Sequence, residues 1–212
     1  MMKLTAAEFA VIFDDLEKVM KENREYLIKL DGVVGDGDLG ITMTDGFGAV
    51  NNYVKTNPEE TDLGKLFYNA GKTMNAHASS SLGTLISSGF MQAGKVFKGK
   101  TEMSGMDIAI FLDAFEQGII KIGKSKVGEK TFLDGFDPAV QVMKQIEKEE
   151  DSKEMLLRAA EAAKKGSDST VGMLAVWGRA ARRGEDSRSL LDPGSVAAAL
   201  IIKTIAECEA VK

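Results

Sequence analysis

The sequence predicts a nearly all-helical protein. Apolar residues recur at three- and four-residue spacing along most of the 212 residues, whereas valine, isoleucine and threonine rarely alternate with period two. Residue pairs that cap helices stand before several of these apolar stripes. The pattern indicates about eight helices joined by short loops. Because no shift in composition marks a boundary, we expect a single domain over residues 1–212.

The first helix is expected to start at a capping box formed by Thr5 and Glu8. An apolar stripe then runs through Phe9 and Phe13 to Leu27, just before a glycine-rich stretch. Spacing of the same kind predicts further helices over residues 43–54, 63–74, 85–97, 104–122, 140–150, 152–165, 169–179 and 196–208.

The ends of these helices follow from local signals. Pro58 stops the second helix, because proline disfavours helical geometry in the residue before it. Ser104 opens the fifth with another capping box, and Gly166 ends the seventh. A polar linker between the fifth and sixth runs up to Lys130. Asp192 is the expected N-cap of the last helix, ahead of a proline in its first turn.

Residues 30–40 contain three aspartates and four glycines, which is the composition of a loop. Asp36 and Asp38 would point to nearly opposite sides of a helix, whereas a glycine-rich turn can aim both at one point. Together with Asp31 they offer hard oxygen ligands, which favour magnesium completed by substrate phosphates. Composition alone leaves a solvated acidic turn as the alternative.

A second polar segment, residues 77–84, precedes the helix over 85–97. Serine hydroxyls and the free N–H groups at a helix N-terminus suit an anion such as phosphate. The alternative is that one serine caps the helix and the other two belong to a surface loop.

Several motif matches are set aside. Residues 35–40 match the dinucleotide fingerprint GxGxxG, but no buried strand precedes them. Residues 118–125 match the phosphate-binding loop GxxxxGKS, but a helical stripe continues into them, so we expect a helix that ends in glycine and lysine. An EF-hand counted from Asp36 would need a glutamate where Phe47 stands. A serine triad is not expected, because His77 is the only histidine and has no recognisable partner.

Composition and termini exclude other classes. The net charge of −5, without a basic tract, argues against nucleic acid as a partner. The apolar run over residues 6–13 is interrupted by Glu8 and is neither a signal peptide nor a membrane span. The only cysteine, Cys208, fits a reducing compartment. We therefore expect a cytoplasmic protein without a membrane partner.

The acidic stretch, the serine segment and the Asp-Pro-Gly sequence at 192–194 together resemble the DhaL family, the nucleotide-binding subunits of dihydroxyacetone kinase. The resemblance covers nearly the whole chain, and its separated motifs occur in the family's order. It implies an all-α antiparallel barrel of eight helices with the nucleotide site at one end.

The resemblance also implies roles for individual residues. Asp31, Asp36 and Asp38 stand at the family's metal-binding aspartates and would hold two Mg²⁺ ions that bridge the phosphates of ADP or ATP. Arg179 would act with these aspartates in catalysis. The other nucleotide contacts that the resemblance implies are Thr42, Ser79, Ser80, Ser81, Leu82, Gly83, Thr84, Thr131, Phe132, Gly178, Asp192 and Gly194.

The implied activity is that of a kinase subunit, a phosphotransferase that acts on dihydroxyacetone or a similar small ketose. In the family a separate DhaK-like subunit holds the ketose, so this chain would need such a partner. Phosphoryl transfer requires mainly positioning and charge neutralisation, so no covalent nucleophile on this chain is needed. A phosphoryl-donor protein of the phosphotransferase system would be a further partner if ADP stays bound; free exchange of ATP, and a homodimer, are left open.

The chain departs from the family pattern near the nucleotide. Leu39 and Thr42 stand where histidine and asparagine are usual, and Leu190 stands where histidine is usual. Each change removes a polar group. The alternative hypothesis is therefore a catalytically weak nucleotide-binding module that regulates a partner protein.

Overall fold

The computed structural model describes residues 2–148 and 151–211. These residues form nine α-helices, two short 3₁₀ helices and two short strands, so the predicted all-helical class is confirmed. The α-helices are α1 (Ala6–Glu22), α2 (Arg24–Val34), α3 (Leu39–Thr56), α4 (Leu63–His77), α5 (Ser81–Val96), α6 (Gly105–Gly123), α7 (Phe132–Met143), α8 (Ser152–Asp168) and α9 (Pro193–Glu207). The remaining elements are β1 (Lys3–Thr5), β2 (Glu102–Ser104), η2 (Ala180–Ser189) and η3 (Glu209–Val211).

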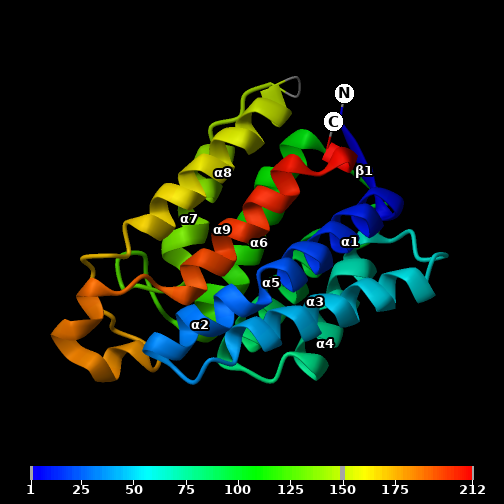
Figure 1. Ribbon diagram of the computed structural model, residues 1–212. Helices are drawn as coiled ribbons and strands as arrows, with labels where there is room; N and C mark the ends of the chain where they lie inside the picture. Colours follow the sequence, from blue (N-terminus) through cyan, green and yellow to red (C-terminus); the bar gives the residue numbers. More distant parts are fainter. Residues whose placement is uncertain (1, 149–150, 212) are drawn as a thin grey trace.

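The helices form a closed ring. Helix α1 packs against α3. From α3 to α9 each helix packs against the next one in sequence, and α9 packs against α1, which closes the ring (Figure 1). Helix α2 continues in the direction of α1, and the helices from α2 to α9 then alternate in direction, so four connections lie at the same end of the barrel, at the lower left of Figure 1. These connections are residues 35–38, 78–80, 124–131 and 169–192. The segments that carry the resemblance to the DhaL family therefore all lie at this end of the barrel.

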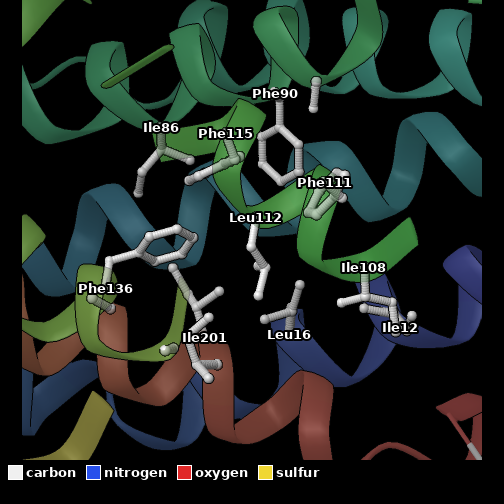
Figure 2. Close-up of a cluster of buried hydrophobic side chains, with 14 of the residues drawn as sticks. Ile12, Leu16, Ile86, Phe90, Ile108, Phe111, Leu112, Phe115, Phe136 and Ile201 are labelled. Atoms are coloured by element: carbon white, nitrogen blue, oxygen red, sulfur yellow. The ribbon is translucent and has the colours of Figure 1, made fainter. Parts of the chain in front are cut away.

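Phenylalanine rings fill the interior of the barrel. Figure 2 shows Phe90, Phe111 and Phe115 on one wall, facing Leu16 and Ile201 on the other. The rings of Phe90 and Phe115 meet edge to face, with their centroids 5.0 Å apart. Apolar side chains also enclose a cavity of about 40 Å³. Burial of this apolar surface is the main term that stabilises the fold.

The predicted first helix is in fact two helices. At Asn23 the side-chain amide donates to the carbonyl of Val19 at 2.8 Å, and α2 begins at the next residue. Helix α2 buries Leu27 and Val34 and continues past Gly32, which faces open space. Asp31, expected in a loop, therefore lies in the last turn of a helix, because the buried face outweighs the cost of one exposed glycine.

The helix predicted over residues 140–150 begins earlier than expected, at Phe132. Helix α7 starts after Thr131, which forms a capping box with Asp134, and it contains Pro138. The proline leaves the carbonyl of Asp134 without its helical donor. Gly166 of α8 passes beside that carbonyl, where a Cβ atom would overlap it. Gly166 therefore lies inside α8 to permit this close approach and does not end the helix.

Three further expectations differ from the structure. Residues 169–179 are turns and not a helix, because their backbone pairs with η2, for example Gly172 N–H to the carbonyl of Arg188 at 2.7 Å. His77, expected in a loop, is the last residue of α4. Helix α9 ends before Cys208, which is its C-cap. The predicted helix over 140–150 extends to positions 149–150, which lie outside the described residues.

The two strands have no signal in the sequence. They pair antiparallel, with Leu4 opposite Met103, and both side chains are buried. Thr5 and Ser104, the predicted caps, end these strands and begin α1 and α6 with complete capping boxes. In the described ranges no single helix is long and apolar enough to span a membrane, and one pair, η2 with α9, reaches that length and composition only across a 76° bend.

Candidate functional site

A close approach of α2 and α3 builds the acidic part of the site. A Cβ atom at Gly40, in the first turn of α3, would overlap the carbonyl oxygen of Arg24 in α2. Between the two helices only residues 35–38 remain for the turn, and Gly37 adopts a φ of 75°, a left-handed conformation that favours glycine. The short turn brings Asp36 and Asp38 next to Asp31, which lies in the last turn of α2.

The three aspartates converge on one point. Carboxylate oxygens of Asp31, Asp36 and Asp38 all lie within 4.8 Å of one another, and the residues are half-buried or exposed. The Asp31 Oδ2 atom also accepts the backbone N–H of Leu39 at 3.3 Å, which joins α2 to the start of α3. Burial and the charges of the other two aspartates raise the pKa of Asp38. Three mutually repelling carboxylates with hard oxygen donors match the ligands that magnesium prefers.

Arg179 reaches this cluster from the opposite side of the barrel end. Its guanidinium forms an ion pair with the Asp36 carboxylate, although the two residues are 143 positions apart in sequence. Gly178, just before it, has a φ of 68° and gives the chain the turn that directs Arg179 toward α2. The Arg179 side chain is 61% exposed, so it is free to meet a second anion.

The serine segment is mostly helical. Ser80 is the N-cap of α5, and its Oγ accepts the N–H of Gly83 at 3.1 Å. The other residues expected there lie on either side of this cap: Ser79 is exposed before it, and Ser81, Leu82 and Thr84 fill the first turn of α5. The segment shares the barrel end with the aspartates, but in the described part of the chain no hydrogen bond or ion pair joins the two groups.

Three other residues predicted to contact the nucleotide lie in different environments. The ring of Phe132 is only 3% exposed and stacks on Phe136, with centroids 5.3 Å apart, so it belongs to the core. Thr131 is half-buried and caps α7. Thr42 is buried in α3. Contacts of these residues with a nucleotide stay predictions.

Asp192 and Gly194 begin α9 beside α7. The Asp192 carboxylate accepts the N–H of Ser195 at 2.6 Å, as expected of an N-cap. Burial raises the pKa of this carboxyl to about 7. Gly194 lies so close to the backbone nitrogen of Phe132 that an added Cβ atom would stand 3.3 Å from it. The cap thus fixes the start of α9 against the start of α7.

Lys130, at the same end of the barrel, has an environment that the sequence does not predict. It was expected in a polar linker, yet it is 2% exposed and has a φ of 62°. Its ammonium group donates to the carbonyls of Thr170 and Leu190. No local pattern signals this burial, because the two acceptors come from segments 40 and 60 residues away.

The motif rejected at residues 118–125 is helical, as predicted. Helix α6 continues to Gly123, and Lys124 caps it in the left-handed conformation with a φ of 57°. His77 Nδ1 lies 3.0 Å from the carbonyl of Thr73, within its own helix.

Comparison with known proteins identifies the family of this chain. Residues 33–207 match the DAK2 domain family. The chain is 30% identical over 205 residues to the ADP-binding subunit DhaL of PEP-dependent dihydroxyacetone kinase 2 from Listeria innocua, covering 96% of this chain and 95% of the relative. It is 28% identical to the ADP-binding subunit DhaL from Escherichia coli K12, covering 89% of this chain and 90% of the relative.

A solved structure shows the same fold. The dihydroxyacetone kinase from C. freundii, in complex with AMP-PNP and Mg²⁺, superposes with a TM-score of 0.70 at 23% identity. The match covers 93% of this chain and 33% of that one, so the present chain spans about a third of that kinase. Fold and relatives together define the class of protein, a kinase subunit built on a helical barrel. Within that class, the chain belongs to the DhaL family.

Proposed function

We propose that this chain binds ADP or ATP with magnesium and transfers a phosphoryl group to dihydroxyacetone or a similar small ketose held on a DhaK-like partner subunit. The observation that carries the proposal is the convergence of Asp31, Asp36 and Asp38 beside Arg179 at one end of the barrel. The proposal treats residues 1–212 as one nucleotide-binding domain, located in the cytoplasm in keeping with the single cysteine.

The proposal places two Mg²⁺ ions between the aspartates and the phosphates. Their oxygens span up to 4.8 Å, and three carboxylates carry more charge than a single divalent ion neutralises. Magnesium bound there would bridge and neutralise the phosphates of the nucleotide. Asp31, held by the N–H of Leu39, would orient the ligand set from α2, while Asp36 and Asp38 approach from the turn.

Arg179 and the N-terminus of α5 would act on the phosphates themselves. Arg179 would leave Asp36 and donate to phosphate oxygens, where its planar group can form two parallel hydrogen bonds. Backbone N–H groups in the first turn of α5, after Ser80, point toward the same barrel end and favour an anion. Both groups stabilise charge that develops during transfer.

The proposal includes bound ADP as a phosphoryl carrier. The relatives that match this chain over nearly their whole length are named as ADP-binding subunits of PEP- or PTS-dependent kinases. We therefore propose that a phosphoprotein of the phosphotransferase system rephosphorylates ADP in place. Native mass spectrometry of the purified protein tests this: a retained mass of ADP with two Mg²⁺ ions supports it, and nucleotide-free protein that turns over free ATP contradicts it.

Reconstitution with a partner subunit tests the proposed kinase activity. Purified chain, a dihydroxyacetone-binding partner subunit, Mg²⁺ and either phosphoprotein or ATP should together form dihydroxyacetone phosphate. Turnover without this chain, or none in any combination despite tight nucleotide binding, would contradict the proposal.

A regulatory module is the second candidate function. Leu39 is buried in the main core, and Leu190 packs with Val34, Ala175 and Ala180, so neither position offers a polar group to a nucleotide. A module of this kind would bind Mg-ADP and a partner protein without turnover. The same reconstitution separates the two candidates, because the module leaves the phosphorylated ketose absent while nucleotide binding persists.

A further inference from the structure

Lys130 is a buried cation at the junction of three chain segments. Its side chain is only 2% exposed, and its ammonium donates to the carbonyl of Thr170 at 2.6 Å and to that of Leu190. Burial lowers its pKa, while the nearby carboxylates of Asp192 and Asp134 oppose this shift. A buried ammonium is tolerated only when such acceptors surround it.

The two carbonyls mark the ends of the segment that carries Arg179. Thr170 begins the turns after α8, and Leu190 precedes the cap of α9. The hydroxyl of Thr170 also accepts the N–H of Asp192 at 3.0 Å. Lys130 and Thr170 therefore close residues 170–190 into a loop whose two ends are held together.

Glu129, the neighbour of Lys130, holds the middle of the same segment. Its carbonyl accepts the N–H of Val176 at 3.2 Å, and its carboxylate accepts the indole N–H of Trp177 at 2.5 Å. Arg179 follows two residues later and reaches Asp36. The stretch 129–130 thus supports the loop at both ends and at the residues just before Arg179.

We infer that Lys130 is a positioning residue for the nucleotide site: its ammonium fixes residues 170–190 so that Arg179 faces the three aspartates. Lys130 touches neither phosphate nor metal and acts through the loop. This inference rests on the proposed function, because it assigns Arg179 to the phosphates.

The chain offers a matched control for the loss of stability. Lys153 Nζ donates to the carbonyl of Ala206 at 2.6 Å, near the opposite end of α9. Lys130→Met and Lys153→Met each remove one ammonium and leave backbone carbonyls without it, so both should lower the melting temperature. Only Lys130→Met should weaken Mg-ADP binding, by about tenfold or more in calorimetry, while Lys153→Met stays within about twofold of the original chain.

Trp177, the only tryptophan of the chain, reports on the loop directly. In Lys130→Met its emission should shift to longer wavelength and become easier to quench with acrylamide, whereas Lys153→Met should leave both unchanged. A purely structural role predicts equal effects of the two variants on Mg-ADP binding and unchanged Trp177 emission, and that result would overturn the inference.

The outcomes distinguish this inference from the proposed function. Failure of the original chain to bind Mg-ADP contradicts the proposed function, and the inference falls with it. If the original chain and Lys130→Met bind equally, only the inference fails. Should Lys130→Met not fold, Lys130→Gln keeps an amide donor for one carbonyl; a loss of about threefold or more supports the inference, and unchanged affinity overturns it.

Discussion

Two groups of carboxylates among the described residues differ in how their charge is compensated: an end cluster of Asp31, Asp36 and Asp38, and a flank cluster of Asp113, Glu116 and Asp137 on α6 and α7. In the flank cluster, neighbouring groups of the chain itself compensate much of the charge. Lys144 pairs with Asp113 at 2.5 Å, and burial, with Asp137 next to it, raises the pKa of Glu116 to about 7, so this carboxyl keeps its proton below neutral pH. In the end cluster, the only ion pair found among the described residues is that of Asp36 with the exposed side chain of Arg179.

The comparison shows that burial and charge pairing distinguish carboxylates with a structural role from carboxylates that could bind a ligand. In the flank cluster, Lys144 pairs with Asp113 and the buried Glu116, only 3% exposed, has a raised pKa. In the end cluster the carboxylates are half-buried or exposed, repel one another and are paired only with the exposed side chain of Arg179 among the described residues. This difference supports the proposal that a divalent cation binds at the end cluster and not at the flank cluster.

The largest effect is expected from Asp36→Asn. The change removes one of the three proposed metal ligands, so Mg-ADP affinity in calorimetry should fall by about 100-fold or more. The melting temperature of the free protein should change little, because the loss of one repulsive charge offsets the loss of the exposed ion pair with Arg179. Asp113→Asn makes the same chemical change in the flank cluster and should leave Mg-ADP affinity unchanged. Equal effects of the two variants would erase the distinction between the clusters.

Glu116→Gln tests the flank cluster by stability against pH. The folded pKa of about 7 lies above the value of an unfolded glutamate, so the stability linked to this group is fully present below pH 4.5 and is lost as pH rises through 7. Near pH 8.5 the glutamine variant should be more stable than the original chain by about 1–3 kcal/mol in urea unfolding, and the two should differ little near pH 4.5. Glu161→Gln, on an exposed face of α8, should show no such difference. Parallel pH profiles for Glu116→Gln and the original chain would contradict the assignment.

Arg179→Gln should sharpen the comparison by removing the cation of the end cluster. In nucleotide-free protein, Mn²⁺ followed by electron paramagnetic resonance should bind about three- to tenfold more tightly, because the competing guanidinium is gone. Mg-ADP should bind more weakly, since the phosphates lose a donor. Arg182→Gln, three residues further along and exposed, removes the same charge as a control. Weaker Mn²⁺ binding in Arg179→Gln would mean that the arginine does not compete with the metal.

The smallest effect is expected from Lys124→Ala. Lys124 caps α6 and belongs to the sequence that matches a phosphate-binding loop. Mg-ADP affinity should stay within about twofold of the original value, because α6 continues through that sequence and forms no loop around a phosphate. A loss of tenfold in the same calorimetric assay would assign this lysine to the nucleotide.

Features set by neighbouring residues could be predicted from the sequence. The capping boxes at Thr5 and Ser104 and the cap at Asp192 are local hydrogen-bond patterns, and all three are formed. Composition alone indicated the three aspartates, because four glycines and three charges in eleven residues predict a turn, although the turn itself spans only residues 35–38.

Features set by distant segments were missed. Helix α7 tolerates Pro138 because Gly166 of another helix passes beside the freed carbonyl. Lys130 is buried because Thr170 and Leu190 supply its acceptors. Residues 169–179 avoid a helix because η2 offers their backbone other partners. In each case tertiary contacts outweigh local propensity, and a single sequence does not display them.

The closed ring has a consequence for the order of the helices along the chain. Strand β1 and the short helix η3 contact one another at the end of the barrel away from the aspartates (Figure 1). Joining these two neighbours and opening the chain in the exposed connection at residues 57–60 would give a circular permutant with the same ring of helices. The end cluster would keep every neighbour it has now, so the site depends on the closure of the ring and not on where the chain starts.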